Sequence, residues 1–505
     1  MVEYFILGFE IVFTLENIIY LFLGTLIGLL FGMIPGLSGV TAVALLVPFS
    51  FELSPVSAML LMIGVYCAST YSGSVSGVIF NMPGDVMGAA TAIEGYQMTK
   101  KGQTLLALST DVFSSFCGGI IGTIMLIFIA PQLVKVALTF GSPEFFALAI
   151  LGLSVVSGMG TKSPLKALIA VFFGLWLATI GLDPISGIDR FTLGNVMLRG
   201  GVDFIPAIIG FFALSEIFFR MYERVVVFKK GEEVLEDIRK TKIAIPSFKQ
   251  MKRLVWTILR SSLIGNFVGM LPGAGATVAA FLGYGVELRV SRNPKIGTGE
   301  MEGVSAPEAA NNSATAGAMV PLLCLGIPGS ATAAVMLGVL ILHGLRPGPL
   351  LFVRMPDLTY SVFVGYFVAN IFFLILAAFG LRYLVRILLI RFDYLAVYLI
   401  IFCVVGSFAI YNRMVDVWIM FICGILGFFF KKYEYSIAGV VLGLVLGRIA
   451  ENGFVNGIAV SRGDFVAFFT RPLTLSLLIV GLIFLILPTI VQYFRSRQEN
   501  KQQAT

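Results

Sequence analysis

The chain of 505 residues is 58% hydrophobic and only 12% charged. Soluble domains carry about 25% charged residues, so this composition excludes an ordinary soluble protein and predicts an all-α polytopic membrane protein embedded in the lipid bilayer. The net charge of +7 does not indicate nucleic-acid binding, because the basic residues lie in loops between apolar runs, where they orient helices in the membrane.

We predict that the first half of the chain, residues 1–222, forms a first membrane repeat. Its apolar runs are interrupted at two breaks. The first long apolar run has glycine at every fourth position from Gly24 and breaks at Pro35-Gly36. Such spacing places glycines on one helix face, where a second backbone can approach closely. A later run, rich in serine, ends in a second break at Asn81-Met82-Pro83-Gly84-Asp85.

Residues 223–253 differ from the rest because they are dense in lysine, arginine and glutamate. By the positive-inside rule they form a cytoplasmic linker. Residues 254–492 then form a second membrane repeat, and the polar, basic tail over 493–505 is also cytoplasmic.

The second half of the chain repeats the breaks of the first half in the same order. Gly269-Met270-Leu271-Pro272-Gly273 echoes residues 32–36, and Gly326-Ile327-Pro328-Gly329-Ser330 echoes residues 81–85. This pattern predicts a two-fold repeat. An acidic segment without Lys or Arg precedes the first repeat and a basic loop precedes the second, which favours inverted topology over a parallel duplication. We expect about twelve spans, some of them broken or re-entrant.

Each Pro-Gly break ends one half-helix and begins another, whose free backbone N–H groups and dipole attract an anion. One break alone could be a simple kink. Four breaks in a repeat favour a binding site at membrane depth. No break contains Arg or Lys, so we expect dipoles rather than salt bridges to hold the anion. The predicted substrate-binding residues are Gly36, Ser38, Asn81, Pro83, Gly84, Gly273, Thr277, Asn311, Pro328, Gly329, Ser330 and Thr332.

Acidic and amide side chains near the second break of each repeat, at Pro83-Gly84 and at Pro328-Gly329, are candidates for ion coupling. We predict that Asp85, Glu308 and Asn312 carry a coupling proton or help to hold sodium, with a sodium site near Asn311 and Asn312. An alternative for Glu308 is structural, because Ser305-Ala306-Pro307-Glu308 matches a capping box at a helix start. The five cysteines lack metal-ligand spacing, and we expect no cofactor.

The motifs GMIPGLSG (32–39), YSGSVSGVIFNMPGD (71–85), GNFVGMLPGAGATVAAFLGYG (265–285) and GVSAPEAANNSATAGAMVPLLCLGIPGS (303–330) are long and specific. With them, nearly the whole chain resembles the large membrane subunit of the tripartite tricarboxylate transporters. The resemblance implies carboxylate uptake across the bacterial inner membrane, driven by sodium or proton symport. It also implies a small four-span membrane subunit and a periplasmic solute-binding protein as partners.

Two other functions share some of these features. An anion channel would also have polar breaks at membrane depth, but it would not need a separate binding protein. An intramembrane serine protease could use Ser38 within Gly36-Leu37-Ser38-Gly39 as nucleophile and His343 as base. The repeat partner Gly273-Ala274-Gly275 has no serine, which indicates that the glycines are the shared requirement. We therefore predict a transporter and not an enzyme.

Overall fold

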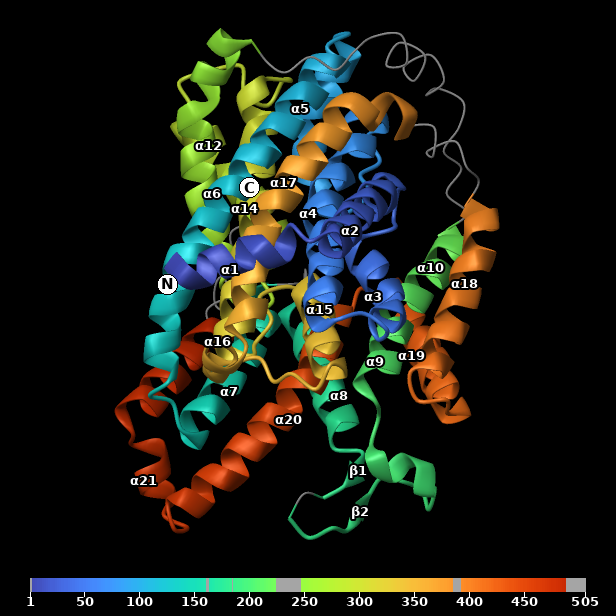
Figure 1. Cartoon of the computed structure of the whole chain (residues 1–505), viewed down its shortest axis with the longest axis vertical. Helices are drawn as coiled ribbons and strands as arrows, with labels where there is room; N and C mark the ends of the chain where they lie inside the picture. Colours follow the sequence, from blue (N-terminus) through green and yellow to red (C-terminus); the bar gives the residue numbers. More distant parts are fainter. Residues whose placement is uncertain (1, 160–162, 184, 224–246, 385–391, 487–505) are drawn as a thin grey trace, which may run out of the picture.

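A computed structural model describes the chain over residues 2–159, 163–183, 185–223, 247–384 and 392–486 (Figure 1). Almost all regular structure in these residues is helical, which confirms the all-α prediction. The exception is a short antiparallel pair of strands, β1 (Gly181–Leu182) and β2 (Asp189–Arg190), followed by the 3₁₀ helix η1 (Val196–Gly200).

Eight helical segments of the described residues are long and apolar enough to cross a membrane. They are Leu15–Met33, Pro55–Phe80, Thr104–Ala137, Phe204–Glu223, Pro356–Gly380, Phe392–Ala409, Met414–Lys432 and Ile437–Val460. Shorter apolar helices accompany them: Gly39–Ser50, Ser142–Val156, Pro164–Ala178, Ala331–Leu342 and Pro472–Ile486. A helix of 12 residues is about 18 Å long and cannot cross a hydrocarbon core of about 30 Å, as expected for half-helices.

The breaks of the two halves separate matching sets of helices. The first set consists of α2 (Leu15–Met33), α3 (Gly39–Ser50), α4 (Pro55–Phe80), α5 (Gly88–Lys100) and α6 (Thr104–Ala137). The second consists of α12 (Phe248–Gly269), α13 (Gly275–Val290), α14 (Met301–Leu325), α15 (Ala331–Leu342), α16 (Pro349–Arg354) and α17 (Pro356–Leu384). We call these helices together the repeat bundle.

Close backbone contacts recur at equivalent positions of the two halves. The glycines of α2 lie against carbonyl groups of α4, and those of α12 lie against carbonyl groups of α14. The matching pairs are Gly28–Val65 and Gly32–Ser69 in the first half, and Gly265–Ala310 and Gly269–Ala314 in the second. The four-residue glycine spacing therefore serves the close helix packing that the sequence predicts.

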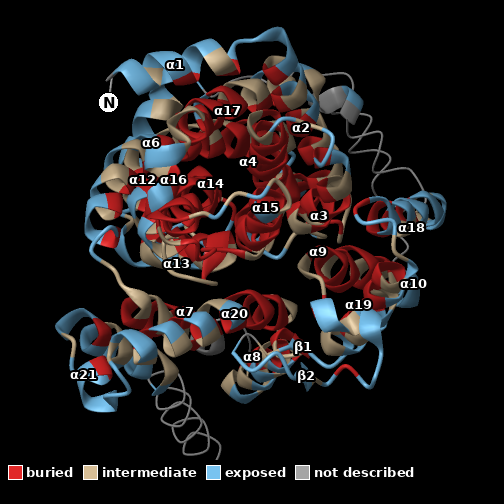
Figure 2. Ribbon diagram, turned by 60° about the horizontal axis from the view of Figure 1, so that its bottom comes forward, coloured by how far each residue is buried: buried red, intermediate tan, exposed pale blue. Residues whose placement is uncertain are grey.

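The remaining helices form a second bundle beside the repeat bundle, and Figure 2 shows the two groups side by side. Its members are α7 (Ser142–Met159), α8 (Pro164–Ala178), α9 (Phe204–Ile208), the π-helical turn η2 (Ile209–Leu214), α10 (Ser215–Glu223), α18 (Phe392–Ala409), α19 (Met414–Lys432) and α20 (Ile437–Val460). The half-helices α3 and α15 join the two groups, because α3 packs on η2 and α18, and α15 packs on α9 and α20. The peripheral helices are α1 (Val2–Val12) and α21 (Phe465–Phe469).

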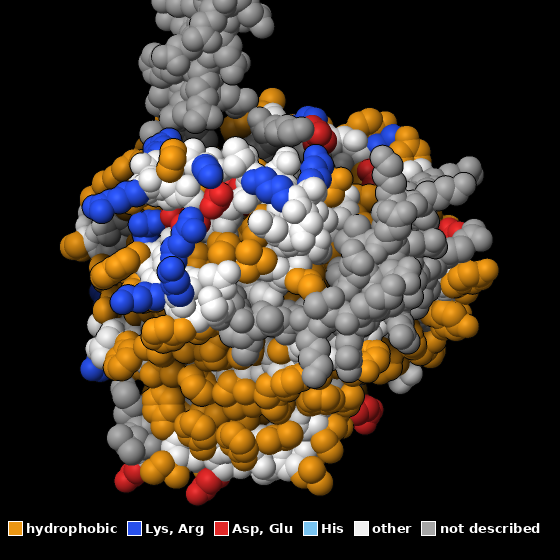
Figure 3. All heavy atoms as spheres, turned by 90° about the horizontal axis from the view of Figure 1, so that it is seen from above, with side chains coloured by type: hydrophobic (Ala, Val, Ile, Leu, Met, Phe, Trp, Pro, Cys, Tyr) orange, Lys and Arg blue, Asp and Glu red, His pale blue; other side chains and the backbone are white. Residues whose placement is uncertain are grey.

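Exposed Lys and Arg gather at one end of the repeat bundle (Figure 3). They come from the end of α5, the start of α12, the last turn of α13 and the loop between α13 and α14. We call this end the basic face, and its residues are Lys100, Lys101, Lys249, Lys252, Arg253, Arg289, Arg292 and Lys295.

The start of the second repeat differs from the predicted boundary. Helix α12 begins at Phe248, so residues 248–253 of the expected linker are helical. Ser247 and Gln250 form a capping box there, with Gln250 Oε1 accepting from the Ser247 backbone N–H at 2.7 Å. A local cap thus starts the helix before the apolar run begins. Residues 224–246 of the linker and the tail over 493–505 lie outside the described residues.

Candidate functional site

The two breaks of the first repeat lie against each other. Gly36 N donates to Gly84 O at 3.1 Å, and Gly84 N donates to Gly73 O at 2.8 Å. Gly36 has φ +80, a conformation that favours glycine. Beyond the break, the Ser38 hydroxyl caps α3 by accepting from Thr41 N. Residues distant in the sequence thus form one compact half-site.

The two breaks of the second repeat are paired in the same way. A β-carbon on Gly329 would lie 2.4 Å from Gly269 O, and one on Gly275 would lie 3.3 Å from the Ser330 side chain. Ser330 caps α15 by accepting from Ala333 N at 3.1 Å.

One hydrogen bond connects the two half-sites at the level of the breaks. The Tyr66 hydroxyl of α4 lies 2.8 Å from Ser330 Oγ. Helix α3 also packs on α15, and α5 packs on α13, so each half-helix that follows a break meets one from the other repeat.

The two half-sites differ in exposure. Asn81 is exposed and ends α4 in the left-handed conformation, and Pro83 beside it is half-buried. At the equivalent position Gly326 also has a positive φ, but Pro328 and Gly329 are buried. The other two predicted hydroxyls lie one turn or less into their half-helices, with Thr277 half-buried and Thr332 buried.

A second polar cluster lies inside the repeat bundle, between α5, α6 and α14. It is built on Asp111 and Glu308, whose side chains are both fully buried. The Ser115 hydroxyl lies 2.8 Å from Glu308 Oε2 and 3.4 Å from Asp111 Oδ1, and it therefore connects the two carboxyl groups. Thr91 donates to Glu308 Oε1 at 2.5 Å, and Ser74 donates to Asp111 Oδ2 at 2.7 Å. We call Asp111 and Glu308 the carboxylate pair.

Among the described residues, no lysine or arginine forms an ion pair with either member of the carboxylate pair. Asn312 Nδ2 lies 3.5 Å from Glu308 Oε2 and donates to Asn311 Oδ1 at 2.7 Å. Among the described residues, the buried Tyr71 hydroxyl has no hydrogen-bond partner. The carboxyl and hydroxyl oxygens of the cluster are the ligands that sodium and other hard cations prefer.

The structure brings two of the three predicted ion-coupling residues together and leaves the third apart. Glu308 and Asn312 share the cluster described above. Asp85 instead lies at the first-repeat break, where its Oδ1 accepts from Val86 N at 2.6 Å. Its charged neighbours there are Glu216 and Lys431.

The alternative that residues 305–308 form a helix cap is wrong. Helix α14 begins at Met301, so Ser305 and Glu308 lie inside it. Ser305 Oγ instead accepts from Ser114 of α6 at 2.7 Å, and the Glu308 carboxyl group binds Thr91 and Ser115. Partners from other helices satisfy the side chains that a cap would have used.

Glu94, an acidic residue of α5, joins the two repeats. Its buried carboxylate accepts from the backbone N–H groups of Gly297, of Gly299 at 2.5 Å and of Glu300 at 2.9 Å. The Tyr284 hydroxyl donates to it at 3.1 Å. This side chain therefore fixes the loop before α14 against α5.

Replacing Glu94 with Gln should destabilise the protein, because a carboxamide turns an N–H group toward backbone donors. We expect a loss of about 3 kcal/mol in unfolding free energy, measured by thermal unfolding of the purified protein in detergent. Glu10→Gln, at an exposed position of α1, is the control. Equal melting temperatures for the two variants would contradict this role of Glu94.

The structure does not bring together the two residues of the protease alternative. Ser38 caps the first turn of α3, whereas the His343 side chain lies near Ser50, at the other end of that helix. Twelve helical residues separate the ends by about 18 Å. His343 also ends α15 as its C-cap, the structural role expected of a lone histidine there.

Three charged residues that the break motifs do not contain are part of these sites. Asp111 was detectable as a single acidic residue inside an apolar run, a pattern typical of functional positions in membranes. Arg220 of α10 lies over Gly36, and Lys431 of α19 forms an ion pair with Glu216 of the same helix α10. Basic side chains from outside the motifs therefore lie near the Pro35-Gly36 break, and the role of the helix dipoles in holding the anion stays a prediction.

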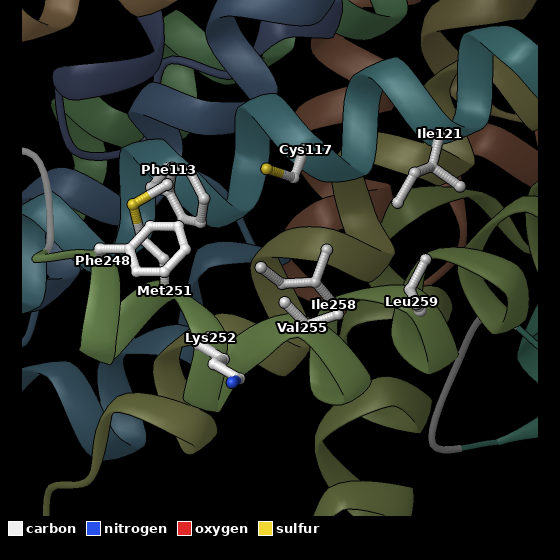
Figure 4. Close-up of a pocket in the computed structure, with 9 residues that line it drawn as sticks. All are labelled: Phe113, Cys117, Ile121, Phe248, Met251, Lys252, Val255, Ile258 and Leu259. Carbon is white, nitrogen blue, oxygen red and sulfur yellow. The ribbon is translucent and has the colours of Figure 1, made fainter.

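An apolar groove of about 480 Å³ opens on the outer surface between α6 and α12 (Figure 4). Among the described residues that line it, Lys252 is the one with a charged side chain. The groove contacts none of the breaks, so it is not part of the candidate substrate site. Its residues are Phe113, Cys117, Ile121, Phe248, Met251, Lys252, Val255, Ile258 and Leu259.

Comparison with known proteins agrees with the motifs at the breaks. Residues 18–442 match the tripartite tricarboxylate transporter TctA family. The chain belongs to this family. It is therefore a membrane subunit of a tripartite transporter, as the sequence motifs predicted.

Two similar proteins come from Agrobacterium vitis. An uncharacterized 52.8 kDa protein in the TAR-I ttuC' 3' region is 36% identical over 488 residues, covering 96% of each chain. An uncharacterized protein in the TAR-II ttuC' 3' region is 35% identical over 236 residues, covering 46% of this chain and 97% of the relative. No solved structure matches the chain.

Proposed function

We propose that this chain carries a carboxylate anion across the bacterial cytoplasmic membrane by symport with sodium or a proton. A periplasmic solute-binding protein supplies the anion, and a small four-span membrane subunit completes the transporter. The observation that carries the symport mechanism is the buried carboxylate pair, which has no basic partner among the described residues.

Two ionised carboxylates cannot remain side by side in a buried site without a compensating charge. A proton shared between Asp111 and Glu308 would remove one negative charge. A sodium ion would balance it, with hydroxyl and amide oxygens as further ligands. Either cation makes occupancy of the cluster depend on the gradient, which is what a symporter needs.

The proposed anion site lies at the four breaks, where half-helix starts offer backbone N–H groups. The link from Tyr66 to Ser330 supports a single site, because it connects the half-sites of the two repeats. Asn81 is exposed and its equivalent Gly326 is buried, which supports a state in which the first half-site is the more accessible one.

Contacts also support the inverted repeat. Along α5, Thr91 binds Glu308 and Glu94 binds Gly299 N, so α5 and α14 run in opposite directions. Helix α5 packs alongside the end of α4 and runs in the same direction. Gly88 near the start of α5 contacts Gly73 of α4, and the later Gly95 contacts the later Val78. Helices α4 and α14 are therefore oriented oppositely, as an inverted repeat requires. The positive-inside rule assigns the basic face to the cytoplasm.

Uptake measurements test this proposal and separate it from an anion channel. Cells that express the complete transporter should accumulate a radiolabelled carboxylate from a panel of citrate, tartrate and succinate. Accumulation should saturate and should stop when the sodium and proton gradients are collapsed together. Uptake that persists without either gradient, or that never saturates, would overturn the symport mechanism in favour of a channel.

A further inference from the structure

The side chain of Arg220 lies directly on the first break. A β-carbon on Gly36 would fall 1.3 Å from Arg220 Nη2 and 1.4 Å from its Cζ. Only a glycine therefore leaves space for the guanidinium group at this position. Arg220 belongs to α10 of the second bundle, so it faces the repeat bundle across the boundary between the two.

The contact between Arg220 and its acidic neighbour Glu216 is weak. Its Nε lies 3.5 Å from Glu216 Oε1, at the outer limit of a hydrogen bond. Lys431 of α19 contacts the other oxygen of the same carboxylate directly. Glu216 is thus paired mainly with Lys431, and the side chains of Arg220 and Glu216 are only 15% and 12% exposed. Among the described residues, no other carboxylate forms an ion pair with this nearly buried guanidinium group, which favours an anion that arrives from outside the protein.

We propose that Arg220 binds one carboxylate of the transported anion at the Pro35-Gly36 break. This inference rests on the proposed function and identifies the cation that recognises the substrate. The carboxylate takes the place of Glu216 Oε1 beside Arg220, and Glu216 stays paired with Lys431. A guanidinium group suits this role because its planar fork matches a carboxylate with two parallel hydrogen bonds. The start of α3 adds backbone N–H groups on the other side.

The position of Arg220 also connects binding to the movement of the two bundles. The carboxylate would contact the repeat bundle at Gly36 and the second bundle at Arg220. An anion that contacts both bundles stabilises the arrangement in which they meet at this break. The substrate therefore influences which arrangement of the bundles is populated.

Concentration-dependent uptake tests the proposal in cells that express the complete transporter, with citrate, tartrate and succinate as probes. Arg220→Ala should raise the half-saturating concentration at least tenfold, and Arg220→Lys should raise it less. Lys432→Ala is the matched control, because Lys432 lies over the rings of Tyr222 and Phe428. An unchanged half-saturating concentration in Arg220→Ala, with gradient-dependent uptake intact, would overturn the role of Arg220 and leave the symport proposal standing.

Chemical restoration of the charge distinguishes recognition from a structural role. Arg220→Cys should lose affinity and should regain part of it after reaction with aminoethyl methanethiosulfonate, which adds an ammonium group. Methyl methanethiosulfonate, which adds no charge, should restore no affinity. The protein without the Arg220→Cys substitution, treated with the same reagents, is the control for reaction at its native cysteines. Equal restoration by both reagents would show that side-chain volume matters rather than charge, and would overturn the proposal.

Discussion

Replacement of Glu308 by Gln should abolish gradient-driven uptake while the protein remains folded in the membrane. Glutamine keeps the size of the side chain and an oxygen that can accept from Thr91, but it removes the charge that a coupling cation must balance. We expect the free energy of ion binding to weaken by about 3 kcal/mol, which corresponds to about a hundredfold lower affinity for the ion. The measurement is uptake as a function of sodium concentration and external pH. Asp111→Asn should have the same effect.

A second buried carboxylate provides the control for the carboxylate pair. Glu287 is also buried, but Arg260 forms an ion pair with it, so no external cation is needed. Glu287→Gln should lower stability and leave the ion dependence of uptake unchanged. If Glu308→Gln and Asp111→Asn both transport with normal ion dependence, the carboxylate pair is structural and the coupling site lies elsewhere.

The breaks were predictable because proline and glycine determine local backbone geometry. The residue pairs that meet across the repeats were not predictable from the sequence, because they depend on how distant helices pack. Ser305-Ala306-Pro307-Glu308 has the pattern of a helix cap, yet Ser114 and Ser115 of α6 bind its polar side chains inside α14. A local pattern cannot distinguish a backbone partner from a hydroxyl on another helix.

Arg220 illustrates the same limit at long range. It lies 184 positions after Gly36 in the sequence, near the end of an apolar segment that borders the basic linker. Its sequence context is that of a residue at the membrane surface. Only the packing of α10 beside the first break makes it part of the site. Asp111, by contrast, could have been found by testing every acidic residue inside an apolar run.

Replacing Gly329 with Val should abolish uptake without removing the protein from the membrane. A β-carbon there would lie 2.4 Å from Gly269 O and 2.7 Å from the Ala318 α-carbon. Both are backbone atoms, so the helices themselves would have to separate, at a cost of about 1–3 kcal/mol. That cost is small beside the insertion energy of a polytopic protein. The same cost is enough to disturb the geometry of the break, where the adjacent Ser330 must cap α15 and bind Tyr66.

The chain offers a matched control for this substitution and an internal replicate. A β-carbon on Gly285 of α13 would meet no neighbouring atom within 4 Å, so Gly285→Ala should transport normally. Gly84, the repeat equivalent of Gly329, would place a β-carbon 1.9 Å from Gly32 O, and Gly84→Val should therefore fail in the same way. Surface labelling and uptake of a radiolabelled carboxylate measure insertion and activity separately. Normal transport by both valine variants would mean that the breaks are packing features, and the anion site would have to lie away from them.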